Sequence, residues 1–233
     1  MKLKPIIFSV LFIVSIFLLI SCNNLNRNQF TFKLENSDLI INKDEWKIQF
    51  DGEGQQFFED TRPFQFLIED NWVSVSSVNS IETSDSSGTI ISLLLENGSK
   101  AEMELTEVSD FAVRMKIKPL GLEATACRGF IELDPVEEIY GFGETWNGRV
   151  AQRGSIIDIW AKNGTPDECA YMPYYVSTKN YALFVNYGGR VIFDVGQKRA
   201  DELVFEAQTG QMEIMLVSGD KISSVVQNFL TEL

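Results

Sequence analysis

Short apolar segments separated by turn residues run through this chain from about residue 30, and this pattern constrains the fold more than any other feature. In the segment 46–50, apolar and polar side chains alternate, which places Trp46, Ile48 and Phe50 on one face of an expected β-strand. Asn97-Gly98 is the strongest hairpin signal. Many short strands, spaced by roughly 8 to 12 residues, predict a sandwich of antiparallel β-sheets.

The expected strands are short, rich in β-branched and aromatic residues, and bounded by turn residues. They cover residues 30–34, 39–41, 46–50, 64–68, 72–75, 89–95, 100–105, 111–117, 128–133, 156–160, 172–177, 181–186, 190–195, 203–207 and 211–217. Only residues 221–233 have helical periodicity, and Ser218-Gly219-Asp220 is expected to cap that helix. We therefore expect an all-β fold with a short C-terminal helix.

The N-terminus has the pattern of a secretion signal. Lys2 and Lys4 precede an apolar run at 6–20, which ends at Leu19-Ile20-Ser21-Cys22. This run is shorter than the roughly 20 apolar residues that a membrane-spanning helix prefers, and polar residues follow at once. An ordinary signal peptide with an incidental cysteine, or an uncleaved helix, is the alternative to a lipoprotein signal.

The tetrad that ends at Cys22 resembles the lipobox of bacterial lipoproteins, in which the cysteine is lipidated and becomes the new N-terminus. The resemblance implies a signal peptide at 1–21, lipidation of Cys22 and a polar tether at 22–29. It also implies a lipid-anchored protein of the bacterial cell envelope, on the outer membrane or facing the periplasm. The membrane is then a partner through the acyl chains.

Charge and residue usage exclude several classes of function. The formal net charge is -13 at pH 7, which disfavours nucleic acid as a partner. The chain contains no histidine, which excludes a Ser-His-Asp triad, a Cys-His pair and the usual histidine-bearing zinc sites within it. Cys127 and Cys169 could pair in an oxidising envelope or remain buried thiols, and no spacing suggests a metal site or a cofactor.

Residues 138–233 resemble glycoside hydrolase family 31, a group of α-glucosidases, α-xylosidases and related enzymes. The cue is Ile139-Tyr140-Gly141-Phe142-Gly143-Glu144, which is similar to the family's Tyr-Gly-Leu-Gly-Glu signature. Further similar segments follow in the family's order: Gln152-Arg153-Gly154, the strand at 156–160, then 172–177, 180–186 and 214–230. Residues 30–137 match only as an acidic, strand-rich stretch. The resemblance implies a galactose mutarotase-like antiparallel β-supersandwich for residues 30–233.

The resemblance also implies where the chemistry lies. Retaining glycosidases need two carboxyl groups about 5 to 5.5 Å apart. In this family both are aspartates of a barrel that follows the sandwich, so we assign no catalytic residue within residues 1–233. Glu144 is expected to bind backbone amides, and an aldose mutarotase activity is excluded because it relies on histidine.

A loop of the family's sandwich folds over the barrel mouth and helps to shape the sugar site. Carried over residue by residue, it is Trp160-Ala161-Lys162-Asn163-Gly164-Thr165. Trp160 could stack on a pyranose, Asn163 could bond sugar hydroxyls where several family members have aspartate, and Thr165 could offer a hydroxyl. As alternatives, Trp160 could lie in the core and Asn163-Gly164 could be a plain turn.

The function that the resemblance implies is that of a non-catalytic N-terminal domain in a family 31 α-glycosidase of carbohydrate metabolism. It would help to shape the site for an α-linked glucoside or xyloside in a barrel that residues 1–233 do not contain. A free-standing surface lipoprotein that binds carbohydrate is the alternative, and a structural remnant with neither activity is a third.

Overall fold

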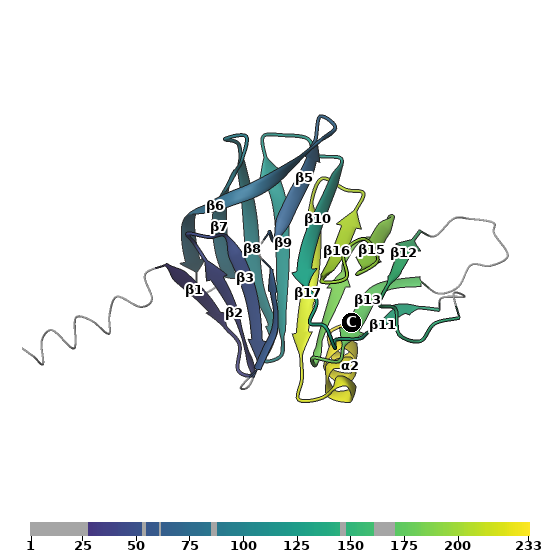
Figure 1. The fold of residues 1–233 in the computed structure, drawn as a ribbon. Helices are drawn as coiled ribbons and strands as arrows, with labels where there is room; N and C mark the ends of the chain where they lie inside the picture. Colours follow the sequence, from purple (N-terminus) through teal and green to yellow (C-terminus); the bar gives the residue numbers. More distant parts are fainter. Residues whose placement is uncertain (1–27, 53–54, 61, 85–87, 145–147, 161–170) are drawn as a thin grey trace, which may run out of the picture.

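The computed structural model describes residues 28–52, 55–60, 62–84, 88–144, 148–160 and 171–233. Within them lie strands β1 to β17 and helix α2 (Figure 1). The strands are β1 (Gln29–Lys33), β2 (Ser37–Asn42), β3 (Lys47–Gly52), β4 (Gln55–Asp60), β5 (Phe64–Ile68), β6 (Asn71–Ser84), β7 (Gly88–Leu95), β8 (Lys100–Ser109), β9 (Ala112–Leu120), β10 (Ala126–Glu132), β11 (Ile139–Gly143), β12 (Ser155–Ile159), β13 (Tyr171–Ser177), β14 (Tyr181–Val185), β15 (Val191–Val195), β16 (Glu202–Ala207) and β17 (Met212–Ser218). Helix α2 covers Ile222–Thr231.

These strands form two antiparallel sheets. The smaller sheet has the order β1-β2-β3-β4, and the larger one β11-β13-β14-β17-β9-β8-β7-β6-β5-β10-β16-β15-β12. The long strand β6 pairs with β5 as far as Ser74 and with β7 from Val75 onward, with register shifts at Val75/Ser77 and Val78/Ser80. Because such bulges bend a strand, β6 lets the large sheet curve around the core. The expected all-β supersandwich with a short C-terminal helix is confirmed.

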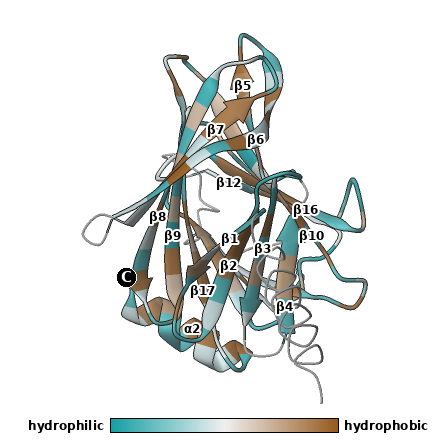
Figure 2. Ribbon diagram, turned by 90° about the vertical axis from the view of Figure 1, so that its left-hand side faces the viewer, coloured by the Kyte–Doolittle hydropathy of each residue, from teal (hydrophilic) through white to brown (hydrophobic). Residues whose placement is uncertain are grey.

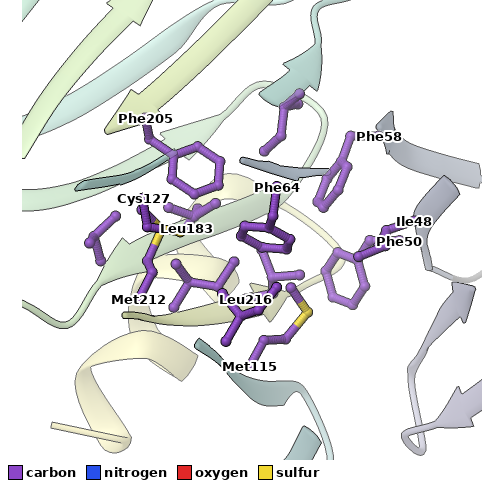
Figure 3. Packing of buried hydrophobic residues seen from close by; sticks show 14 of the residues in the cluster. Ile48, Phe50, Phe58, Phe64, Met115, Cys127, Leu183, Phe205, Met212 and Leu216 are labelled. Atoms are coloured by element: carbon purple, nitrogen blue, oxygen red, sulfur yellow. The ribbon is translucent and has the colours of Figure 1, made fainter. Parts of the chain in front are cut away.

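Alternating side chains account for the packing between the sheets. Trp46, Ile48 and Phe50 are all buried, as their spacing predicts. Figure 3 shows Phe50 and Phe58 of the small sheet facing Met115 and Leu216 of the large sheet. Figure 2 shows hydrophobic and hydrophilic residues interspersed along the strands, as expected for sheets with one buried face.

Three parts of the sheet structure differ from the expectation: β4, the second half of β6, and β11, whose residues were not among the expected strands. No strand was expected at β4, where the neighbouring Phe57 and Phe58 are both buried instead of alternating with polar residues. Strand β6 was expected only at 72–75, because its second half is mostly polar and exposed. Pairing with β7 along nearly its whole length keeps this polar half extended.

The core holds one of the two cysteines outside the signal. Cys127 is a fully buried free thiol, and burial raises the pKa of that thiol far above its ordinary value. Cys169 lies outside the described residues, so the expected alternatives of a Cys127–Cys169 disulfide or two free thiols stay untested. At neutral pH the Cys127 side chain therefore behaves as a small apolar group.

Helix α2 packs on the outer face of β13, β14 and β17. The ring of Phe229 stacks on that of Tyr174, with centroids 4.1 Å apart. The expected cap is wrong in detail: Lys221 occupies the N-cap position without a side-chain cap bond. Asp220 instead bonds the Ser224 hydroxyl, which lowers the pKa of the Asp220 carboxyl. Within the described part of the chain, no helix is long and apolar enough to cross a membrane.

Candidate functional site

The signature segment forms β11, an edge strand with unusual backbone angles. Gly141, Phe142 and Gly143 have φ values of 126°, 67° and 74°, and the pairing with β13 shifts between the two glycines. Only glycine adopts such values without steric cost, so the two glycines let Phe142 turn into the core. Its ring lies 4.8 Å from that of Phe193, centroid to centroid. The signature therefore has a structural role in this fold. Its last residue, Glu144, is exposed.

Arg153, in the second similar segment, fastens the region around β11. Its guanidinium donates to the backbone carbonyls of Asp134 at 2.7 Å, Glu137 at 2.6 Å and Ala200 at 2.8 Å. Hydrogen bonds from a charged donor are stronger than those between neutral groups. Arg153 therefore joins the segment before β11 to the turn between β15 and β16.

Three carboxyl groups are buried in the described part of the chain, and each holds a local backbone structure. Asp60 accepts hydrogen bonds from the amides of Arg62 at 2.8 Å and Phe130 at 3.3 Å. Glu137 accepts bonds from the Asp134 amide and the Ser177 hydroxyl, and Asp194 accepts from the amides of Gln197 and Lys198. These three carboxyl groups therefore have structural roles.

The buried Asp60 predicts a dependence of stability on pH. Burial raises the pKa of this carboxyl well above its ordinary value of 3.8. Between the unfolded and folded pKa values the folded chain binds more protons, so the free energy of unfolding falls as the pH rises through this range. Between about pH 4 and neutrality, we expect the melting temperature of the Asp60→Asn variant to fall less than that of the unaltered chain. Asp110→Asn, at an exposed position, is the control, and equal slopes in both variants would contradict the prediction.

Trp160 directly follows β12 and starts the segment that was expected to reach a sugar. Its side chain is 46% exposed, so the alternative that it lies in the core is wrong. The Arg190 guanidinium carbon lies 5.5 Å from the centroid of the indole ring. Arg190 is itself held by both carboxylate oxygens of Asp158, at 2.8 and 2.7 Å. The guanidinium of Arg190, paired with Asp158, therefore lies beside the exposed indole ring of Trp160.

The segment returns to the described fold at Tyr171, the first residue of β13. Tyr171 is 37% exposed and pairs with Gly143 of β11, beside Glu144. Strand β12 lies against β13, and Figure 1 shows β11, β12 and β13 together at one side of the molecule. Asn163 and Thr165 lie outside the described residues, so their expected roles stay predictions.

The candidate site therefore consists of two exposed aromatic residues at the two ends of segment 161–170: Trp160, beside the Arg190–Asp158 pair, and Tyr171, paired with Gly143. Aromatic faces beside polar side chains suit the stacking of a pyranose ring and the bonding of its hydroxyls. Tyr171 and Arg190 were missed from the sequence. Tyr171 directly precedes an expected strand and Arg190 begins another, and only the fold places Arg190 beside Trp160.

A family model described as the glycosyl hydrolase 31 N-terminal galactose mutarotase-like domain matches residues 24–194. The chain belongs to this family. Two curated relatives are an α-xylosidase from Lactiplantibacillus pentosus, 30% identical over 96 residues, and one from Emericella nidulans, 26% identical over 102 residues. The matches cover 40% and 42% of this chain. They span only 12% and 13% of the length of these relatives.

Solved structures of family 31 enzymes share the fold. The cycloalternan-forming enzyme from Listeria monocytogenes aligns over 86% of this chain and 25% of its own, with a TM-score of 0.59 and 14% identity. A family 31 sulfoquinovosidase from E. rectale aligns over 78% of this chain and 32% of its own, with a TM-score of 0.54 and 13% identity. At these identities the likeness concerns the family 31 sandwich fold alone.

Proposed function

We propose that this chain is the non-catalytic N-terminal domain of a family 31 α-glycosidase, and that it borders the sugar site of a barrel that follows it. The observation that carries the proposal is the family match over residues 24–194. The α-xylosidase relatives, which are much longer than the matched part, support an α-linked xyloside or glucoside as the substrate class.

The geometry of the loop ends supports a role at the edge of that site. Arg153 fastens the segment before β11, and the bulge at Gly141 shapes the pairing of β11 with β13, while Trp160 and Tyr171 are exposed. A rigid support reduces the entropy cost of holding a substrate in place. The sandwich would contribute binding and positioning, and the barrel would contribute both catalytic carboxylates.

The mass of the native product distinguishes this proposal from a free-standing binding lipoprotein. An immunoblot of source cells, with an antibody to residues 30–233, should reveal a band much larger than the 26.4 kDa of this chain. A band near 26.4 kDa would instead favour the free-standing alternative.

Replacing Trp160 tests the role at the sugar site in the full native gene product. We expect Trp160→Ala to raise KM for an aryl α-xyloside or α-glucoside by roughly five- to tenfold with little change in kcat, since it removes an aromatic contact. Trp160→Phe should retain most of the affinity. Ile156→Ala, at a similarly exposed position on β12, is the control. An unchanged KM in Trp160→Ala would place the sugar elsewhere.

We also propose that Cys22 carries the lipid anchor and that residues 22–29 are the tether to an envelope membrane. The support is the charged start, the short apolar run and the lipobox-like tetrad. Gln29, the last residue of this proposed tether, is also the first residue of strand β1.

A further inference from the structure

A polar groove whose lining does not include Trp160 lies where the start of α2 faces the small sheet. Its volume is about 590 Å³, within the range of about 300 to 1,000 Å³ that is common for ligand pockets. The lining residues come from loops and strand ends that are distant in sequence. They are Asn36, Gln55, Phe57, Phe111, Asn180, Ser218, Gly219, Asp220, Ser224, Gln227 and Asn228.

Most of the polar side chains that line this groove are uncharged. Side-chain amides dominate it, and Asp220 is the one charged residue among the lining residues, all of which are described. An anion such as phosphate would find no cation here and would meet the carboxylate of Asp220.

Three of the amides are held in place through their own donor groups. Their NH2 groups donate to backbone carbonyls, Gln55 to Lys179 at 2.9 Å, Asn180 to Asp220 at 3.2 Å and Asn228 to Ser218 at 2.9 Å. The side-chain carbonyl oxygens of these amides accept no hydrogen bond from the described residues. Fixed acceptor oxygens, together with the Asp220 carboxylate, suit a ligand that presents several hydroxyl donors.

The groove also has an apolar part. Phe57 and Phe111 belong to its lining, and the Phe57 ring is fixed by packing against Phe50 at 5.3 Å between centroids. Phe57 is only 2% exposed, so the partly buried Phe111 supplies the aromatic surface beside the amides, which would suit the C–H groups of a pyranose.

We infer that this groove binds a neutral oligosaccharide, at a site separate from the one beside Trp160. The inference stands on the amide lining, the fixed acceptors and the absence of cationic side chains among the lining residues.

Gln227 offers the sharpest test because its side chain is exposed and makes no hydrogen bond with the described residues. Calorimetric titration of the full chain with maltotriose, isomaltotriose and xylose should show saturable binding of at least one of them. Gln227→Ala should weaken that binding by roughly three- to tenfold, the loss expected for about one hydrogen bond, without destabilising α2. Gln211→Ala, an exposed amide outside the groove, is the matched control.

Two further variants make the outcomes decisive. Trp160→Ala should leave the affinity unchanged, whereas a loss in this variant alone would assign the binding to the other site and overturn the inference. Asp220→Asn should retain sugar binding within about threefold, because the amide keeps an acceptor oxygen. Binding of CaCl2 that Asp220→Asn abolishes, with no saturable binding of any of the three sugars, would show a cation site and overturn the inference.

Discussion

Replacing Gly141 by alanine is expected to lower the free energy of unfolding by about 3 kcal/mol or more. The φ angle of Gly141 is 126°, a value that L residues rarely adopt. An added Cβ would lie 2.7 Å from the carbonyl oxygen of Tyr174 and 2.9 Å from the Cα of Tyr175. Both atoms belong to the backbone of β13, so neither can move aside as a side chain would. Thermal or urea unfolding of the full chain measures the loss.

Gly98→Ala is the control for this prediction. Gly98 also has a positive φ, 82°, but an added Cβ would meet nothing within 4 Å. The Gly98→Ala substitution should therefore lower the free energy of unfolding only through left-handed backbone strain, by about 1 to 2 kcal/mol. If Gly141→Ala costs no more than Gly98→Ala, the close packing of β11 on β13 does not constrain the signature as proposed.

Cys22→Ala is expected to abolish lipid attachment, because it removes the thiol to which the lipid would be joined. Cells grown with a labelled fatty acid should label the unaltered protein and not the variant. The label reports the modification directly, whereas pelleting with membranes could persist through an uncleaved apolar signal.

Asn23→Ala is the matched control, since it changes the adjacent residue and leaves the cysteine in place. It should retain the label and remain in the membrane fraction. Label in Cys22→Ala at the level of the unaltered protein would mean that another residue carries the lipid, and the proposed anchor would be wrong.

Local sequence patterns predicted most strands of this fold correctly. The alternation in 46–50, the turn at Asn97-Gly98 and the helical spacing at the C-terminus all depend on residues a few positions apart. Strand β4 was missed because neighbouring residues Phe57 and Phe58 are both buried. The polar half of β6 was missed because its extended shape depends on pairing with β7.

The family signature was also visible in the sequence, but its physical role was not. The tertiary structure shows that the glycines beside Phe142 permit positive φ values and a bulge against β13. In the same way, Arg153 was recognised as part of a similar segment, while its three carbonyl partners lie 16 to 47 residues away. Neither role follows from a local pattern.

By itself the sequence determined the all-β class, the C-terminal helix, the family segments and the exclusion of histidine chemistry within the chain. Local side-chain periodicity and residue identity suffice for these conclusions. Only the tertiary structure decided that Trp160 is exposed beside Arg190, and that Gln55, Asn180 and Gln227 line one groove. Exposure and groove lining depend on long-range strand pairing and packing, which bring together residues that no short stretch of sequence connects.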